Sequence, residues 1–114
     1  MKTRIIVNLE VEGIHRWKDA KTRLPEVAYL ANYHRHLFKI QVVMGVEDLD
    51  REIEFIDFKH SVEWHVKETW GEELGLVMFG DSSCEMIATE ILNHFGAKKV
   101  IVMEDGENGA EVER

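Results

Sequence analysis

Three histidines at the ends of two alternating segments are the residues with the clearest chemical potential in this sequence. Read with a period of two, His34 and His36 head an apolar row that continues through Phe38. The segment 3–15 has the reverse order, because its apolar face ends at His15. If the two segments pair as antiparallel strands, the three imidazoles converge on one face. Three neutral nitrogen ligands with an open fourth position are what a catalytic zinc site uses.

The alternative is that these histidines are ordinary core or interface residues. A single histidine on an apolar face usually has that role, and a surface His-x-His pair is common. The third histidine, at the matching end of the partner strand, favours the metal site. Burial of three imidazoles for no purpose would leave polar nitrogens without partners, which is costly.

Length, charge and cysteine content limit the classes of function. The 114 residues are enough for one domain with a single core, residues 1–114. The net charge of −8, without a Lys/Arg cluster, argues against nucleic acid or an anionic membrane as a partner. One cysteine excludes an internal disulfide, and the first residues alternate instead of forming a signal-like apolar run. We therefore expect a cytoplasmic protein.

The middle of the chain is expected to contain a long connection, a second strand and a helix. Residues 16–33 are predicted to connect the strands, with a short helix from Pro25 to Asn32. The second strand is predicted over 34–46, and a short extended piece over 51–56. Asp57 is a suitable N-cap for a helix over 58–70. His60 and His65 lie outside the apolar stripe of that helix and are expected to be exposed or peripheral.

The last third is predicted to form a helix followed by a hairpin. After a short apolar link over 74–79, Ser82 and Glu85 have capping-box spacing before a helix over 84–95. Cys84 lies on its apolar stripe near the N-terminus, where burial is favoured over a stabilised thiolate. Strands over 99–104 and 110–113 follow. Glu104 ends an inward apolar row, and its carboxylate either reaches solvent or binds a ligand. The order predicts an α+β fold with helices on one face of an antiparallel sheet.

Five stretches, in this order, resemble a known family. They are Gly13-Ile14-His15, His34-Arg35-His36-Leu37-Phe38, Glu54-Phe55-Ile56-Asp57-Phe58, Ser82-Ser83-Cys84-Glu85 with Ile87-Ala88, and Val102-Met103-Glu104-Asp105. Together they resemble the 6-pyruvoyl-tetrahydropterin synthase and 6-carboxy-tetrahydropterin synthase family. The resemblance implies the ββααββ tunnelling fold, in which a four-stranded antiparallel sheet carries two helices on one face and several subunits form a barrel.

The resemblance also implies a site and a function. Zn²⁺ would be held by His15, His34 and His36, with water or substrate in the fourth position. Glu104 would anchor the ring of a pterin or related purine-like heterocycle, with Glu85 a weaker substrate-binding candidate. The pocket would lie between subunits of a homo-oligomeric ring such as a hexamer. An active protein would be a zinc-dependent lyase of the 6-carboxy-tetrahydropterin synthase type. The resemblance also suggests a role beside queuosine metabolism.

Two departures from the family pattern favour a second hypothesis. Leu30 occupies the position of the family's catalytic cysteine, and residues 71–83 contain no histidine where the family has an Asp-His pair. A non-catalytic protein that binds or sequesters a nucleobase-like ligand is therefore the alternative, and a purely structural metal in an oligomeric scaffold is a third possibility. The catalytic residues are not assigned by the sequence.

Overall fold

Two long antiparallel strands form the centre of the sheet in the computed structural model, which describes residues 1–114. β1 (Thr3–His15) and β2 (His34–Val46) have the bounds expected from their alternation. They pair along their whole length, with His15 opposite His34 and Gly13 opposite His36. Their inward residues are apolar and their outward residues mostly polar, as antiparallel strands with one covered face require.

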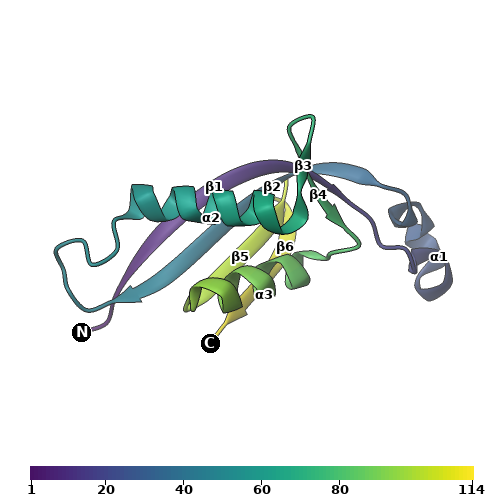
Figure 1. The fold of residues 1–114 in the computed structure, drawn as a ribbon. Helices are drawn as coiled ribbons and strands as arrows, with labels where there is room; N and C mark the ends of the chain where they lie inside the picture. Colours follow the sequence, from purple (N-terminus) through teal and green to yellow (C-terminus); the bar gives the residue numbers. More distant parts are fainter.

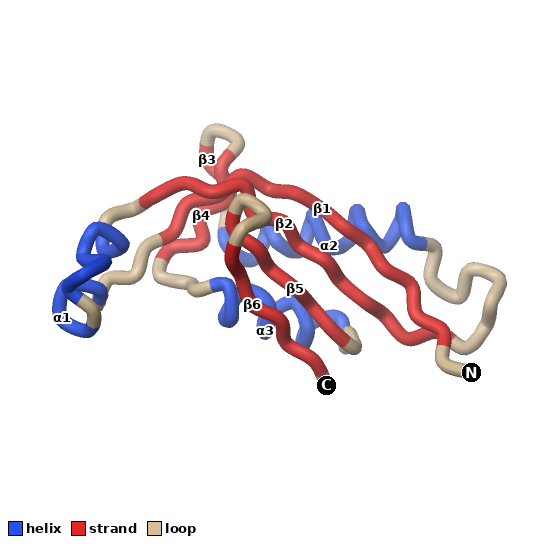
Figure 2. Tube along the Cα trace, turned by 180° about the vertical axis from the view of Figure 1, so that it is seen from behind, coloured by secondary structure: helices blue, strands red, loops and turns tan.

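Four shorter strands extend this pair on both sides (Figure 2). The sheet has the order β3-β4-β1-β2-β5-β6. The added strands are β3 (Glu72–Glu73), β4 (Leu76–Gly80), β5 (Lys99–Glu104) and β6 (Asn108–Glu113). β5 and β6 form the C-terminal hairpin expected from the sequence, and β5 pairs with β2 so that Glu104 lies opposite Phe38.

Two helices cover one face of the sheet (Figure 1). α2 (Phe55–Trp70) packs against β1 and β4, and α3 (Cys84–Phe95) packs against β5 and β6. Nineteen buried residues between these helices and the sheet form one core cluster. The connection between β1 and β2 contains α1 (Ala20–Arg23) and a 3-10 helix, η1 (Pro25–Ala31), at one end of the molecule. None of the helices combines the length and apolar composition needed to cross a membrane.

The prediction of a four-stranded antiparallel sheet in a ββααββ tunnelling fold was wrong. The sheet has six strands and is mixed, because β4 pairs in parallel with β1 at Gly13–His15, and four helical segments are present. The additional strand β4 overlaps the residues expected to be a short apolar link, 74–79, and β3 lies just before them. Val77 and Phe79 alternate into the core, and a turn with positive φ at Leu74 and Gly75 folds β3 back on β4.

The N-caps of helices α2 and α3 also differ from expectation. Residues 51–54 form turns instead of an extended strand, and α2 begins at Phe55 with Glu54 as its N-cap in place of Asp57. The Glu54 carboxylate accepts backbone N–H groups of Ile56 and Asp57, which explains the earlier start. α3 begins as expected at Cys84, but Ser83 is its N-cap, so Ser82 and Glu85 do not form a capping box.

His65 is buried, contrary to the expectation of an exposed or peripheral residue, whereas His60 is exposed as expected. The His65 ring stacks on His94 of α3 with ring centroids 3.7 Å apart, and its Nε2 lies 3.7 Å from Glu90 Oε2. The buried face of α2 is therefore wider than its apolar stripe, because α3 supplies a polar neighbour for the imidazole.

We expect Gly13→Ala to destabilise the protein by about 1–3 kcal/mol, measured by urea denaturation. A Cβ on Gly13 would lie 2.7 Å from the Phe79 ring and 3.0 Å from the Val77 carbonyl oxygen. Gly45→Ala is the matched control, because its Cβ would meet only the flexible Lys98 side chain, and its effect should stay within about 0.5 kcal/mol. Equal stability of the two variants would contradict the close packing of β1 on Phe79.

We expect the free energy of unfolding to decrease as the pH is lowered below about 6.5, because of His65. Burial lowers the pKa of His65, the facing His94 lowers it further, and Glu90 acts in the opposite direction. The folded state then binds fewer protons than the unfolded state, so this contribution is complete above the unfolded pKa and is lost as pH falls through the lowered folded pKa. Urea midpoints between pH 5 and 8 should show a weaker pH dependence in His65→Gln. His60→Gln should retain the wild-type dependence, and a wild-type slope in His65→Gln would disprove this origin.

Candidate metal centre

His15, His34 and His36 come together on the covered face of the sheet, at one end of β1 and β2. The register places His15 directly opposite His34, and His36 lies two residues further along the same face of β2. One nitrogen of each ring lies within 4.8 Å of the others, and the ring centroids are 4.7–5.4 Å apart. His15 is buried and the other two are partly exposed. The predicted convergence is therefore confirmed, and the cluster could hold a metal ion.

The Nδ1 atom of each ring has an acceptor that fixes its protonation. His15 Nδ1 lies 2.8 Å from the Ser82 carbonyl oxygen, and His34 Nδ1 lies 2.8 Å from the Asn32 carbonyl oxygen. A carbonyl oxygen can only accept, so these Nδ1 atoms donate. His36 Nδ1 donates to Asp105 Oδ2 at 2.7 Å. In a neutral ring the proton is then on Nδ1, which leaves the Nε2 lone pair free to bind a metal.

The Nε2 atom of His15 has an unfavourable environment unless a cation is present. It is buried and makes no hydrogen bond, although Glu104 Oε2 lies 3.0 Å away. The contact is close enough for an ion pair, but its alignment does not meet hydrogen-bond geometry. Without a cation the nitrogen lone pair would face a carboxylate oxygen. A proton or a metal ion removes this repulsion, so the residues present fit a bound metal.

The charged neighbours shift the titration of the site. Burial lowers the pKa of His15, but contact with Glu104 and the bond to the Ser82 carbonyl outweigh burial, so the pKa is raised. Contact with His15 lowers the pKa of Glu104, which burial partly opposes and the charge of His36 reinforces. The Leu37 backbone N–H, followed by His36, lowers the pKa of Asp105. Both acids are therefore carboxylates near neutral pH.

Cys84 is buried at the start of α3, as expected, and its Sγ lies 3.6 Å from Glu104 Oε2. Burial raises the pKa of the Cys84 thiol to about 12, and the negative charge of Glu104 contributes. The thiol therefore donates to the carboxylate instead of ionising. Its position at a helix N-terminus does not produce a reactive thiolate.

A pocket of about 490 Å³ adjoins the histidines, a size suited to a small molecule. Glu85 is exposed in the first turn of α3 and lies on the pocket wall, without contact to the histidines. The wall also contains the apolar side chain of Leu30. Its lining residues include His15, Arg16, Trp17, Arg23, Leu30, His34, Cys84, Glu85 and Glu104.

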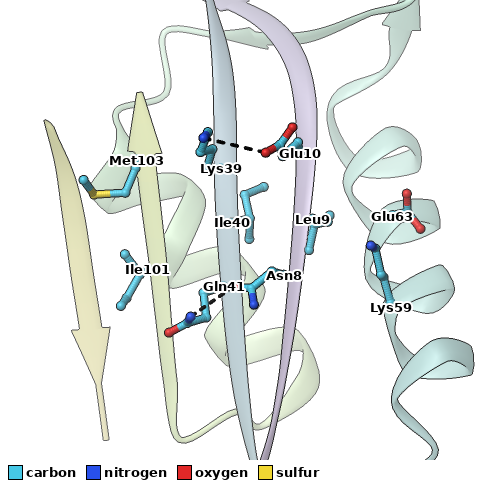
Figure 3. A pocket seen from close by; sticks show the side chains of 10 residues that line it. All are labelled: Asn8, Leu9, Glu10, Lys39, Ile40, Gln41, Lys59, Glu63, Ile101 and Met103. Atoms are coloured by element: carbon cyan, nitrogen blue, oxygen red, sulfur yellow. Dashed lines mark hydrogen bonds and ion pairs between the residues drawn. The ribbon is translucent and has the colours of Figure 1, made fainter. Parts of the chain in front are cut away.

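A second hollow, of about 620 Å³, lies between strands β1, β2 and β5 and helix α2 (Figure 3). Its polar side chains on β1 and β2 form pairs across the two strands. Lys39 Nζ lies 3.7 Å from Glu10 Oε1, and Gln41 donates to Asn8 at 3.0 Å. No group of metal-ligating side chains converges there, so the chemistry is concentrated at the histidine end.

Asp105 is the main contributor to the site that the sequence did not assign. Its Oδ1 accepts the Leu37 backbone N–H at 2.9 Å while Oδ2 accepts His36 Nδ1, and its own N–H donates to the Leu37 carbonyl. The turn after β5 is therefore fastened to β2 beside the metal centre. The Ser82 carbonyl was also missed, because it reaches His15 through the β1–β4 pairing. An Asp-Gly turn directly after Glu104 was the only available signal.

We expect Asp105→Asn to weaken the binding of a metal ion by the three histidines about 10–100-fold, measured by competition with a chromophoric chelator. The amide has one acceptor oxygen for two N–H donors, so the His36 ring loses its fixed orientation. Asp81→Asn is the matched control, because Asp81 pairs with Arg16 and has no contact with the histidines. Unchanged affinity in Asp105→Asn would show that the His36 ring is oriented by other contacts.

Comparison with known proteins supports the fold alone. No protein family model matches the chain, and no curated protein matches it. A similar solved structure is the crystal structure of an uncharacterized protein from Wolinella succinogenes, with a TM-score of 0.66 and 13% sequence identity. The match covers 100% of this chain and 99% of the other. The two chains therefore share an arrangement of strands and helices although their sequences differ widely.

Proposed function

We propose that the protein holds Zn²⁺ on His15, His34 and His36 and binds a pterin or related purine-like heterocycle in the adjoining pocket. The observation that carries the proposal is the convergence of three rings whose Nδ1 atoms all have acceptors. Their Nε2 lone pairs are left near one another, with one of them buried and unpartnered. Three imidazoles with an open position are typical of catalytic zinc.

The heterocycle is supported by the pocket and by Glu104. The pocket wall contains two of the three histidines and the Glu104 carboxylate, so a ligand in it can reach both. A carboxylate can accept two adjacent ring N–H groups of a pyrimidine edge, the role that the family resemblance gives to Glu104. Glu85, on the same wall, is a secondary contact for polar groups of the ligand.

The leading form of the proposal is a diverged synthase or lyase of the 6-carboxy-tetrahydropterin synthase type. Zinc, when bound, supplies a Lewis acid that polarises a hydroxyl or carbonyl of the ligand. The histidines hold the ion, Glu104 orients the ring, and the partly buried position of the centre limits water. No side chain supplies a thiolate, since Leu30 stands at the family cysteine position and Cys84 stays protonated.

The absence of a thiolate favours a second candidate, a protein that binds or sequesters the same heterocycle without turnover. Leu30 presents an apolar side chain to the pocket, and Cys84 donates to Glu104. Both contacts suit ligand binding as well as catalysis. The two candidates share the site and differ only in whether product forms.

We also propose that subunits associate through sheet edges into a homo-oligomer. On β1, strand β4 pairs only with residues Gly13–His15, so most of the outer edge of β1 has no strand partner. β6 is the terminal strand on the other side. Unpaired edges are ready templates for association. The mass of the purified protein in solution tests this point, and a strict monomer would contradict it.

The metal proposal is tested by elemental analysis of the purified protein. We expect about one zinc per chain in the wild type. His34→Ala should lose most of the metal, because it removes one of three ligands, while His60→Ala, on the exposed face of α2, should retain it. Wild-type protein without zinc, or full zinc content in His34→Ala, would contradict the proposed centre.

Incubation with dihydroneopterin triphosphate separates the two candidates. Product formation, followed by chromatography, supports the enzyme. A rise in melting temperature without product supports the binding protein, since a ligand stabilises the state that binds it. If zinc-loaded protein shows neither product formation nor a rise in melting temperature, the choice of heterocycle is contradicted.

A further inference from the structure

Glu104 lies against the histidines more closely than a distant ring anchor requires. Its Oε2 is 3.0 Å from His15 Nε2, and its Oε1 is 3.5 Å from His36 Nε2. In a tetrahedral site with bonds of about 2.0–2.1 Å, neighbouring ligand atoms are about 3.3 Å apart. The carboxylate oxygens therefore stand at the separations that a fourth ligand would have from these two nitrogens.

The charge on Glu104 has no other cationic partner. Its ion-pair contacts are with His15 and His36 only, and neither Lys nor Arg approaches it. The Glu104 side chain is only 27% exposed, so water solvates it incompletely. A partly buried carboxylate facing imidazole lone pairs requires a proton or a metal ion between them.

Cys84 holds the carboxylate in this position. Its thiol lies 3.6 Å from Oε2, the oxygen that also approaches His15. Metal-bound carboxylates are commonly oriented by hydrogen bonds from residues behind them. Cys84 is thus a positioning residue, which accounts for a buried thiol that the proposed chemistry does not otherwise use.

We propose that Glu104 is the fourth protein ligand of the metal while the pocket is empty, and that an incoming heterocycle draws this carboxylate away. The inference rests on the proposed metal centre and assigns Glu104 two alternating roles. Both carboxylate oxygens face the histidines, Oε2 toward His15 and Oε1 toward His36, so the carboxylate must turn away before both oxygens can accept a pair of ring N–H groups. Binding of the ring therefore opens the coordination position that the reacting group of the ligand occupies.

The test uses Co²⁺ in place of zinc, because its visible spectrum reports the ligands. The Co²⁺ spectrum of ligand-free Glu104→Gln should differ from the wild type, and its zinc affinity should be at least about tenfold weaker. Glu111→Gln is the matched control, because Glu111 is an exposed glutamate on β6 that pairs with Lys99, and it should behave as the wild type. Glu104→Asp, which keeps the charge but withdraws the oxygens by one methylene, should show the same direction of change and guards against misfolding of the amide variant.

The outcomes separate the two proposals. Unchanged spectra and affinities in both Glu104 variants, with Co²⁺ bound, would overturn the role of Glu104 and leave the histidine centre intact. A wild-type protein that binds no Co²⁺ would overturn the metal centre and this inference with it. Addition of the pterin to wild-type Co²⁺ protein should move its spectrum, and saturating pterin that leaves the spectrum unchanged would contradict the exchange.

Discussion

The antiparallel register between β1 and β2 is the constraint on which the rest of the site depends. Side chains alternate between faces along a strand, so a slip of one residue would transfer each inward side chain to the other face. The inward residues Val7, Leu9 and Val11 pair with Val42, Ile40 and Phe38 in the core. This apolar row fixes the register, and the register in turn places His15 opposite His34. The core therefore determines the position of the ligands.

The chemistry of the imidazoles is determined by polar contacts from outside the strand pair. The turn after β5, the segment before α3 and the end of the β1–β2 connection each supply one acceptor to an Nδ1 atom. Because these acceptors come from three separate segments, the complete fold is needed before all three Nε2 lone pairs face the same space. The strand pair alone would bring the rings together without fixing their tautomers.

The parts of the fold that the sequence predicted are those with a repeating pattern and a buried face. The two long strands, α3 and the C-terminal hairpin were predicted for this reason, and with them the meeting of the three histidines. β4 was missed because it has five residues and follows a turn at Leu74, a residue type that rarely adopts positive φ. Its parallel pairing with β1 also depends on residues more than 60 positions apart, which no local pattern reveals.

Side-chain roles were harder to predict than elements. His65 departs from the apolar stripe of α2, and only the packing of α3 provides the His94 ring that covers it. Asp105 reads as a turn residue, and its role follows from the β2–β5 register that brings Leu37 and His36 beside it. The resemblance to the tunnelling-fold family rested on stretches that exclude residues 72–80, so it could not anticipate the strands formed there.

The candidate metal ligands and the wall of the adjoining pocket lie in different parts of the chain. The histidines are on the two central strands, whereas the pocket wall comes largely from the connection between them and from residues 81–86 at the start of α3. That connection is fastened to itself, since the Trp17 N–H donates to the Leu30 carbonyl at 2.7 Å and Arg23 lies over the Trp17 ring. A leucine at position 30 therefore changes what the pocket can do without disturbing the register of β1 and β2. An intact histidine centre beside a wall that lacks a nucleophile is thus structurally consistent, because the two features are built by separate sets of contacts.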